Sequence, residues 1–301
     1  MRFNRLDLNL LVALDALLDE KKTTAAAQRL SVSQSAISGM LARLRVYFED
    51  DLLVQVGRQM ELTPLGRDLA DPVRQLILQI QATVAIRPAL SIATERRNFK
   101  ITVSDYTVPI LIAPLVRRLQ ALAPCITITL LPQIENTGLA LRRGETDLTI
   151  VPDGYLDADH PHLLLFEDSY SCVVWDGNTE VGATLDLATF ARCGHVAPHL
   201  GRPGAPTVAE RHLAASGVTR SIAVTTHDFT SQATLVVGTQ LITTMQTRLA
   251  HDSAARLPLR VLAVPVAMPT LRVCMQWHDY QSADPAHRWL REQLVAVAQP
   301  A

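Results

Sequence analysis

A short polar and basic segment near the N-terminus carries side chains suited to recognising nucleic acid. The run TTAAAQRLSVSQSAISGMLARLRVYF, residues 23–48, contains no Asp or Glu, although the chain of 301 residues has a net charge of −1. Residues 21–48 carry five Lys and Arg, whereas residues 1–20 hold two Arg against four acids. Glutamine and serine hydrogen-bond the edges of bases, and phosphates repel acidic side chains. We therefore expect this segment to face DNA; the alternative is a helical bundle with a solvated polar face.

The spacing of apolar residues predicts three helices and a two-stranded wing around this segment. Leucines at helical spacing indicate a first helix over about residues 7–20, and an alanine-rich second helix covers about residues 24–30. Ser33 is the expected N-cap of a third helix that runs to about Phe48. Two short strands are expected around a Gly57-Arg58 turn. This order is that of a winged helix-turn-helix, whose second helix enters the major groove.

The apolar residues of segment 64–86 recur at helical spacing, which predicts a long helix. At about 1.5 Å per residue this helix would measure roughly 34 Å. Its apolar stripe persists through Pro72, so one kinked helix and two shorter helices are both compatible with the sequence. The stripe favours pairing with the helix of a second chain over packing on its own chain. Residues 87–98 are the expected linker.

The remainder of the chain is expected to form an α/β domain with a largely parallel sheet. Strand-like runs alternate there with helical or loop segments, as is typical of such a domain. The expected strands cover residues 99–104, 126–131, 147–151, 170–175, 221–226 and 271–277. The chain is thus expected to divide into a DNA-binding domain over residues 1–63, a linker helix and hinge over 64–97, and a third part over 98–301.

The sequence contains no pattern typical of an enzyme, a cofactor site or a strong metal site. The motifs GxSxG, HExxH and GxGxxG and the phosphate-binding loop are absent. Four cysteines without CxxC spacing indicate buried thiols in a reducing compartment, and the close histidine pair His160 and His162 is a weak metal candidate. Polar residues interrupt the apolar N-terminal run, so neither a signal peptide nor a membrane span is expected. We expect a cytoplasmic protein that binds no membrane, metal or cofactor.

The sequence resembles LysR-type transcriptional regulators over nearly its whole length, closest to the NodD-like branch and the regulators of aromatic-compound catabolism. The most specific match lies in the first 66 residues, in LDLNLLVALDALL and TAAAQRLSVSQSAISGMLARLRVYFEDDLLVQVGRQMELTPLG. The runs FKITVSD, LRRGETDLTIVP, GHVAPHLGRPGAP and DPAHRWLREQL continue the resemblance. The resemblance implies that Gln34, Ser35 and Ser38 of the recognition helix contact DNA bases. It also implies that Arg43 and Thr24 contact the DNA backbone and that Arg58 contacts DNA from the wing.

A few positions depart from the pattern of that family. The family commonly has an aromatic and then a basic residue in the first strand of the wing, where this chain has Leu53 and Gln55. Proline often follows the Ser-Gln pair, where this chain has Ser35. These departures bear on the phosphate contacts of the wing and on the operator sequence, and not on DNA binding itself. Gly39 has no side chain, which we expect to leave room for the groove.

The resemblance further implies that residues 98–301 form two α/β lobes like those of periplasmic binding proteins, with a small-molecule cleft between them. The first lobe is expected over about residues 98–166 and 267–301, and the second over about 167–266. Ligands of open α/β sheets bind beyond the carboxyl ends of strands and near helix N-termini. By family position the cleft residues are Ser104, Phe229, Thr230 and Arg248, with His199 as a further candidate. The alternatives are a helix cap for Ser104 and a surface ion pair for Arg248.

We therefore expect a sequence-specific transcriptional regulator, without enzymatic activity, that binds double-stranded promoter DNA. The expected inducer is apolar or aromatic with one acidic or phenolic group, which the planar guanidinium of Arg248 would suit. Linker helices and sensor domains are expected to build a homodimer or homotetramer whose rearrangement alters the DNA bend and permits contact with RNA polymerase. The alternative is a small-molecule sensor or solute-binding protein that does not bind DNA.

Overall fold

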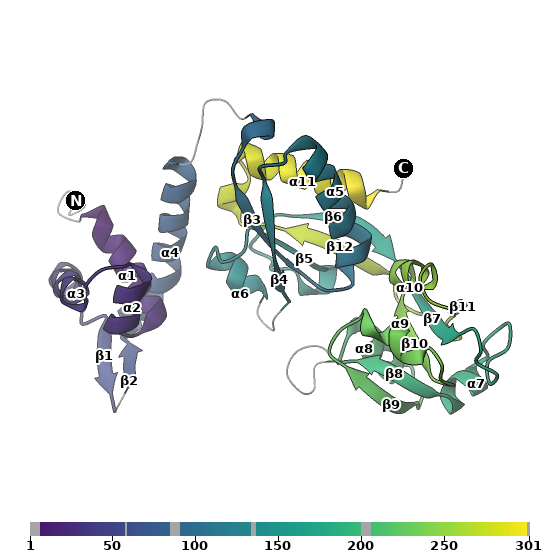
Figure 1. Ribbon diagram of the computed structural model, residues 1–301. Coiled ribbons are helices and arrows are strands. Elements are labelled where there is room, and N and C mark those ends of the chain that lie inside the picture. Colours follow the sequence, from purple (N-terminus) through teal and green to yellow (C-terminus); the bar gives the residue numbers. More distant parts are fainter. Residues whose placement is uncertain (1–6, 58, 85–90, 134–136, 200–205, 300–301) are drawn as a thin grey trace. The chain divides into compact units, whose positions relative to one another are not determined.

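The computed structural model describes residues 7–57, 59–84, 91–133, 137–199 and 206–299. The chain folds as two compact units, Met1–Arg87 and Pro88–Ala301. Figure 1 shows the first unit as a group of helices with a small hairpin, and the second as two sheets flanked by helices. The predicted boundary at residue 63 lies inside the first unit, because the long helix that begins there shares the core of that unit.

Three helices and a hairpin surround one apolar core in the first unit. The helices are α1 (Leu8–Glu20), α2 (Thr23–Arg29) and α3 (Gln34–Phe48), and the antiparallel hairpin joins β1 (Leu53–Val56) to β2 (Gln59–Leu62). The side-chain oxygens of Asp7 and Ser33 cap α1 and α3 by accepting backbone N–H groups of the first turn. The fully buried core side chains include Leu14, Leu17, Ile37, Leu44 and Leu52. The predicted winged helix-turn-helix is confirmed.

A single helix, α4 (Pro64–Val84), follows the hairpin and continues through Pro72, so the sequence forms one helix here and not two. Part of its apolar stripe packs on its own chain, because Val73 and Ile77 belong to the core of the first unit and α4 contacts α1. That part of the stripe therefore packs on its own chain, which was the alternative to pairing with the helix of a second chain. Leu76 and Val84 remain exposed, at 41% and 80%.

Buried ion pairs fasten α4 to α1. Arg74 Nε lies 2.5 Å from Asp15 Oδ1, and Arg74 Nη2 lies 3.0 Å from Asp19 Oδ2. Arg29 of α2 reaches the same carboxylates, at 3.3 Å from Asp15 and 2.7 Å from Asp19. Burial raises the pKa of Asp15, and the charges of the two guanidinium groups oppose that rise. One charge network thus joins three helices of the first unit.

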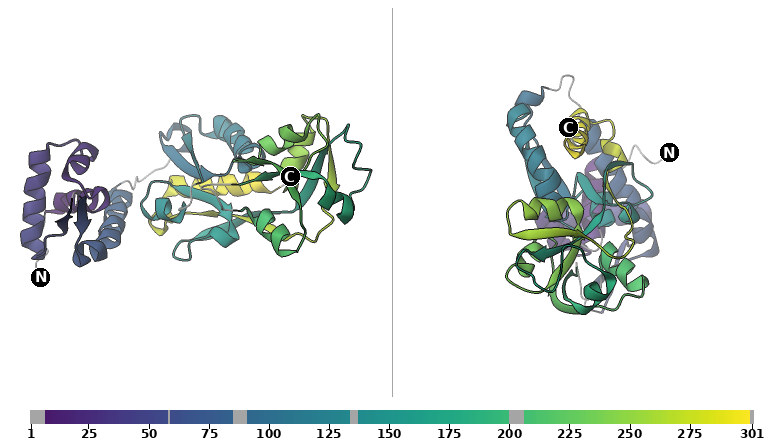
Figure 2. Two further views of the ribbon diagram at one scale, coloured as in Figure 1. Left: turned by 90° about the horizontal axis from the view of Figure 1, so that it is seen from below. Right: turned by 90° about the vertical axis from the view of Figure 1, so that its right-hand side faces the viewer.

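Two five-stranded sheets, one in each lobe, form the second unit (Figures 1 and 2). The sheet of the first lobe has the order β4 (Thr127–Pro132), β3 (Asn98–Val103), β5 (Leu148–Pro152), β12 (Leu271–Gln276) and β6 (His162–Asp168). The sheet of the second lobe has the order β11 (Leu259–Ala263), β7 (Tyr170–Trp175), β10 (Ile242–Gln246), β8 (Gly194–Pro198) and β9 (Ser221–Thr226).

The expectation of a largely parallel sheet is only half right. In each sheet two strand pairs are parallel and two are antiparallel. Every antiparallel pair involves β7 or β12, the strands with which the chain enters a lobe from the other one. The chain makes these crossings at Ser169 and through residues 264–270.

Four strands, β6, β8, β10 and β11, were not among the predicted strands. In β10 the buried Thr243 interrupts the apolar pattern that would have marked a strand. Its hydroxyl finds partners only after folding, namely Val196 O at 2.9 Å and Gln232 Oε1 at 2.7 Å. Long-range partners therefore allow a polar sequence in a buried strand.

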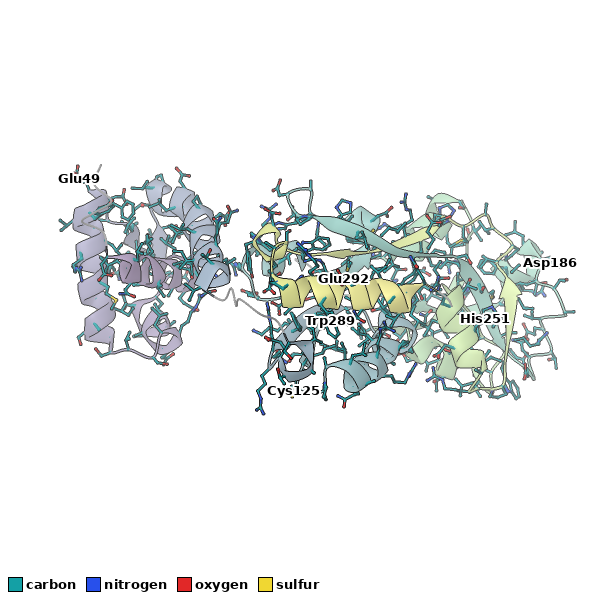
Figure 3. The ribbon with its side chains drawn as sticks, turned by 90° about the horizontal axis from the view of Figure 1, so that it is seen from above. Glu49, Cys125, Asp186, His251, Trp289 and Glu292 are labelled. Carbon is teal, nitrogen blue, oxygen red and sulfur yellow. The ribbon has the colours of Figure 1, made fainter. Side chains whose placement is uncertain are left out.

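Helices cover the two sheets. The π-helical turn η3 (Val108–Ile112) runs into α5 (Ala113–Leu122), which packs on the C-terminal helix α11 (Pro285–Ala298). Figure 3 shows α11 with Trp289 and Glu292. The other elements are η2 (Ile92–Thr94), α6 (Thr137–Arg142), η4 (Asp153–Tyr155), α7 (Leu187–Arg192), α8 (Val208–Ala215), α9 (Ser231–Val236), α10 (Thr247–Ala254) and η5 (Asp279–Gln281). Within the described ranges, no helix is both long and apolar enough to cross a membrane.

Candidate nucleic-acid interface and ligand cavity

The first turns of α3 expose a polar surface without acidic groups. Gln34, Ser35 and Ser38 are all exposed, whereas Ile37 between them is fully buried. The Ser35 hydroxyl lies 2.9 Å from the hydroxyl of Ser33, the cap of the same helix. A Cβ atom at Gly39 would meet no atom within 4 Å, so packing does not require glycine there. This surface is open to a partner molecule.

The five basic residues of segment 21–48 divide into two groups. Arg29 is held by the carboxylates of α1, and Arg45 donates hydrogen bonds to two backbone carbonyls at the start of the hairpin, at 2.9 and 2.7 Å. The side chain of Arg43 is 61% exposed, and the carboxylate paired with it lies as far as 3.9 Å away. Lys21 and Lys22 are exposed as well. Two of the five cations are therefore engaged within the first unit: Arg29 pairs with carboxylates of α1, and Arg45 bonds backbone carbonyls.

The wing offers a smaller surface. Gly57 adopts φ +63° in the turn, and Gln55 Nε2 donates to the Gly57 carbonyl at 3.2 Å. Leu53 is 1% exposed, so the departure from an aromatic residue at this position concerns the core and not a partner. Arg58 lies outside the described residues. Thr24, the second residue of α2, is partly exposed.

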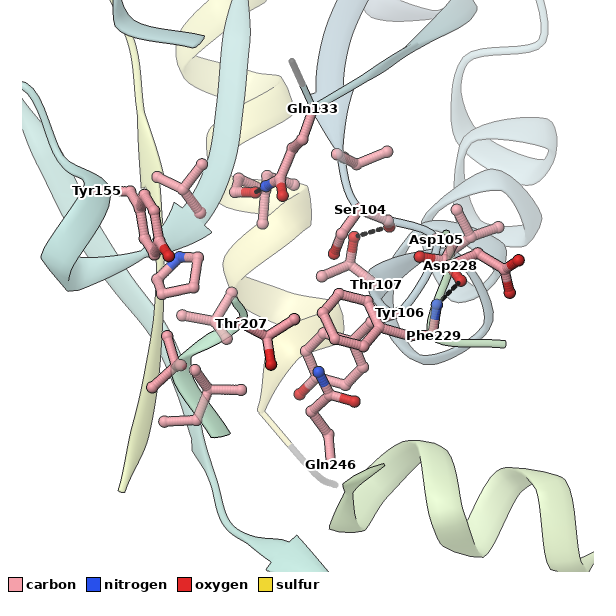
Figure 4. A pocket seen from close by; sticks show the side chains of 18 of the residues that line it. Ser104, Asp105, Tyr106, Thr107, Gln133, Tyr155, Thr207, Asp228, Phe229 and Gln246 are labelled. Carbon is pink, nitrogen blue, oxygen red and sulfur yellow. Dashed lines mark hydrogen bonds between the residues drawn. The ribbon is translucent and has the colours of Figure 1, made fainter. Parts of the chain in front are cut away.

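A cavity of about 680 Å³ lies between the two lobes of the second unit (Figure 4). Its walls come from the carboxyl ends of β3, β4 and β5, from β12, and from α8, the turn before α9 and the end of β10. Apolar side chains form most of the wall, and the volume is in the range of small-molecule sites. The polar lining residues are Ser104, Asp105, Tyr106, Thr107, Gln133, Tyr155, Tyr170, Thr207, Arg211, His227, Asp228 and Gln246.

Two hydrogen-bonded contacts join the lobes across this cavity. Asp105 Oδ2 of the first lobe accepts the backbone N–H groups of Phe229 at 2.8 Å and Thr230 at 2.7 Å. Arg211 Nη1 of the second lobe donates to the Tyr155 hydroxyl at 2.9 Å, and its guanidinium lies 5.5 Å from the centre of that ring. Figure 4 places Asp105 and Tyr155 at opposite sides of the cavity. A change in the angle between the lobes must therefore strain or break one of these contacts.

The cavity has an acidic side. The Tyr106 hydroxyl donates to Asp168 Oδ2 at 2.6 Å, and burial followed by the charge of Asp168 raises the pKa of Tyr106. Burial opposes the ionisation of Asp228, yet hydrogen bonds from Ser231 and neighbouring hydroxyls hold its pKa below the ordinary value. In Figure 4 Asp105 and Asp228 lie together, away from Tyr155, the partner of Arg211. The cavity is thus polarised from one wall to the other.

The structure brings only part of the expected ligand residues to the cavity. Ser104 and Phe229 line it, and Thr230 contributes a backbone N–H group to Asp105. His199 forms an isolated bridge with Pro206 and is not among the lining residues.

Arg248 does not reach the cavity wall. Its guanidinium lies 4.3 Å from the centre of the Phe166 ring, and its Nη groups lie 3.4 Å from Ala298 O and 3.3 Å from Glu167 O. The turn from β10 into α10 directs the side chain toward β6 and α11, and the pairing of Arg248 with an acidic ligand stays a prediction. Arg211, one turn after the N-cap Thr207 of α8, does line the cavity.

Sequence reasoning missed Arg211 and Gln246. The sequence signal for Gln246 was its place at the end of the run LITTMQTR, two residues before the arginine that was chosen. For Arg211 the only local signal is a helix start at Thr207, which marks no ligand site by itself.

The candidate metal ligands are not brought together. His160 is buried against His278, with ring centres 4.6 Å apart, whereas His162 is exposed on β6. No group of three or more His, Cys, Asp or Glu residues suited to a metal occurs in the part of the chain that the structure describes. The four cysteines are free thiols, and burial raises the pKa of Cys172 to about 12.

A winged helix-turn-helix followed by a two-lobed domain with a cavity between its sheets is the architecture of a bacterial DNA-binding regulator. The family model described as "Bacterial regulatory helix-turn-helix protein, lysR family" matches residues 8–67, and "LysR substrate binding domain" matches residues 93–299. The chain is 37% identical to Nodulation protein D 1 of Bradyrhizobium diazoefficiens over 298 residues, which cover 99% of this chain and 95% of that protein. It is 38% identical to Nodulation protein D 2 of Rhizobium tropici, with the same coverage.

A probable transcriptional regulator of Pseudomonas aeruginosa has a similar solved structure, with a TM-score of 0.65, 26% identity and 97% of each chain covered. The chain therefore belongs to the LysR family of DNA-binding transcriptional regulators, in agreement with the resemblance of its sequence to the NodD-like branch. Members of this family are regulators and not enzymes, which sets aside both an enzyme and a solute-binding protein without a DNA partner.

Proposed function

We propose that this regulator binds promoter DNA in the cytoplasm through α3 and is controlled by a small molecule held between the lobes of its second unit. The observation that carries the proposal is the exposed surface of α3, where polar side chains meet no acid. Gln34, Ser35 and Ser38 are the proposed readers of base edges, and Arg43 and Thr24 are the proposed contacts to phosphates. Arg58 is proposed to contact DNA from the wing, and Gly39 to allow close approach.

The proposed inducer is an apolar or aromatic molecule with one acidic or phenolic group. The apolar walls of the cavity support the apolar body, and Arg211 supports a place for an acidic or acceptor group. Ser104 and Phe229 are proposed to contact the inducer, and Thr230 to act through its bond with Asp105.

The proposed control works through the two arrangements of the lobes. A ligand shifts such an equilibrium only by binding one arrangement more tightly than the other. A molecule that contacts Tyr155 or Ser104 of the first lobe and Arg211 or Phe229 of the second touches both lobes, so its affinity depends on their angle. We propose that the response is transcriptional activation, with pairing of two or four copies, assisted by the exposed Leu76 and Val84 of α4, and with contact to RNA polymerase.

A mobility-shift assay tests the DNA-binding part. The purified chain should bind DNA from upstream of its own gene or the neighbouring gene, and the binding should weaken steeply with salt because phosphate contacts release counterions. A scrambled fragment of equal length and composition is the control. Equal binding to both fragments, or no dependence on salt, would rule out sequence-specific regulation by this chain.

A further inference from the structure

Three elements of the first unit meet at Leu52, between the recognition helix α3 and the wing. Its backbone adopts φ +60°, a left-handed conformation that is uncommon for a residue other than glycine, and its side chain is fully buried. The Leu52 carbonyl accepts the Thr63 N–H at 3.1 Å, so the end of the wing returns to this point. A Cβ atom at Gly66 would lie 2.5 Å from the same carbonyl, so the first turn of α4 is seated against it. The end of α3, the base of the wing and the start of α4 therefore converge in one junction.

The Asp50 carboxylate holds this junction from one side. Its Oδ1 atom accepts the Leu52 N–H at 2.6 Å and the Thr63 hydroxyl at 2.7 Å. The Thr63 hydroxyl oxygen in turn accepts the Gly66 N–H of the first turn of α4 at 3.0 Å. The hydrogen bond from Thr63, followed by that from Leu52, holds the pKa of Asp50 below its ordinary value. One side chain thus connects the end of the recognition helix to the start of α4.

Arg45, in the last turn of α3, holds the junction from the other side. Its Nε atom donates to the Asp51 carbonyl at 2.9 Å, and its Nη2 atom donates to the Leu53 carbonyl at 2.7 Å. These two carbonyls flank Leu52 in the chain. A guanidinium reaches two acceptors at once because its N–H groups form a planar fork. Arg45 therefore ties the start of β1 to the recognition helix.

We infer that Asp50 and Arg45 are positioning residues for DNA binding, which hold the wing and the start of α4 at a fixed place relative to the recognition helix. The inference rests on the proposal that both α3 and the wing contact DNA. A wing that is already ordered loses little entropy when it meets DNA. A loose wing must be ordered during binding, and its affinity falls accordingly.

The charge of Asp50 allows position to be separated from electrostatics. Removing an acid near DNA by itself strengthens binding, because phosphates repel carboxylates. Loss of the junction should have the opposite effect. Asp50→Ala and Asp50→Asn remove the same charge, but only asparagine keeps an oxygen that accepts from Leu52 and Thr63.

Mobility shifts of the full chain on the promoter fragment that the parent chain binds test the inference. Asp50→Ala should bind about tenfold more weakly than Asp50→Asn, because its wing is ordered only during binding. Asp68→Ala and Asp68→Asn, which remove an exposed carboxylate of α4, should bind alike. Equal affinities of the two Asp50 variants, or tighter binding by Asp50→Ala, would overturn the inference.

Arg45→Lys is a second variant, and it keeps the charge. Lysine lacks the planar fork and cannot hold both carbonyls in the same geometry. Specific binding should weaken by about fivefold, whereas binding to a scrambled fragment, which depends on charge, should stay like that of the parent. Full specific affinity in Arg45→Lys would show that Arg45 does not position the wing.

Hydroxyl-radical footprinting at equal occupancy gives a readout that a general loss of stability does not change. The parent should protect one set of sugars beside α3 and a flanking set beside the wing. In Asp50→Ala only the flanking set should be lost, whereas a chain that is merely less stable gives the parent pattern. Both sets intact in Asp50→Ala would contradict the inference.

The outcomes separate the inference from the function on which it rests. If the parent chain shows no specific binding, the proposed DNA recognition fails and the inference fails with it. If the parent binds without a flanking set, the wing does not contact DNA, and the inference fails while the role of α3 stands.

Discussion

The recognition surface of α3 and the cavity of the second unit are built in opposite ways. On α3 the polar side chains are neighbours in the sequence, exposed and free of acids. In the cavity they come from segments spread over residues 103–273, and several are already bonded within the chain. A surface for a long, charged partner can thus be carried by one helix, whereas a site for a small molecule exists only after two lobes have folded together.

The two regions also differ in how they are held. The helix carrying the recognition surface belongs to a unit in which ion pairs of the buried Arg74 and the exposed Arg29 join three helices. The lobes meet at the cavity through the hydrogen bonds that Asp105 accepts and the one that Arg211 donates. We therefore expect the first region to be rigid and the second to be adjustable, and the following changes probe that contrast.

The largest expected effect is the loss of the charge network in the first unit. Arg74→Met leaves the buried Asp15 and the partly buried Asp19 with one cation fewer, which should lower the free energy of unfolding of this unit by about 3–5 kcal/mol. Hydrogen exchange of the amides of α1 and α4 measures the effect, with the exposed Arg67→Met on the same helix as control. Similar exchange in both variants would contradict a network that holds α4 to α1.

Acid should weaken only the second unit through its histidines, since all nine lie beyond residue 98. His287 is buried between Asp147 O and Arg291, and burial lowers its pKa to about 4. Between pH 4 and 6.5 the folded state thus binds fewer protons than the unfolded chain. The contribution of the neutral His287 to the free energy of unfolding is complete above the ordinary pKa of about 6.5. It falls as the pH drops toward 4, by at most about 1.4 kcal/mol per pH unit.

Urea unfolding followed by tryptophan fluorescence measures this loss, because all three tryptophans lie in the second unit. His287→Gln keeps a donor and an acceptor without a titrating ring and should make the dependence between pH 6.5 and 4 less steep. Part of it should remain, because burial also lowers the pKa of His278 to about 4. The exposed His251→Gln should leave the dependence as it is. A parent-like slope in His287→Gln would show that other groups cause the acid sensitivity.

A smaller effect is expected where the lobes meet. Asp105→Ala removes the acceptor of two charge-assisted hydrogen bonds, which should cost about 2 kcal/mol and speed hydrogen exchange of the Phe229 and Thr230 amides by roughly thirtyfold. Asp176→Ala, exposed in the second lobe, is the control. Unchanged exchange at these two amides would mean that Asp105 does not hold the lobes together.

The smallest expected effect separates stability from recognition on α3. Gly39→Ala has open space around the new methyl group and should stabilise the helix by about 0.5–1 kcal/mol. The same change should weaken DNA binding if the backbone approaches the groove. Gly66→Ala is the opposite control, because its Cβ would lie 2.5 Å from Leu52 O and should destabilise the unit. Gly39→Ala with full DNA affinity would remove Gly39 from the interface.

The first unit was largely readable from sequence because its signals are local. Helical spacing and the cap at Ser33 predicted the elements of the unit, and they form within a few residues of the expected bounds. The charge count was less reliable, because Arg29 finds its partners on another helix. Likewise, α4 packs on α1 of its own chain, and no local pattern of residues 64–86 reveals this contact.

The cavity was readable only where family position pointed to it. Ser104 and Phe229 were found, whereas Arg211 and Gln246 become lining residues only when β10 and α8 pack beside the first lobe. Arg248 was chosen for its chemistry, but its direction is set by the turn after Gln246 and by its contact with Phe166. Residue type indicates which chemistry is possible, and long-range packing decides which side chain delivers it.

The most direct test of the central claim is the affinity of α3 variants for the specific promoter fragment. Gln34→Ala and Ser38→Ala should each lose about 1–3 kcal/mol of specific binding, roughly a five- to 150-fold rise in Kd, with melting temperature and non-specific binding unchanged. Gln120→Ala, exposed on α5, should bind like the parent chain. If all three variants bind the fragment equally well, α3 does not read DNA through these side chains.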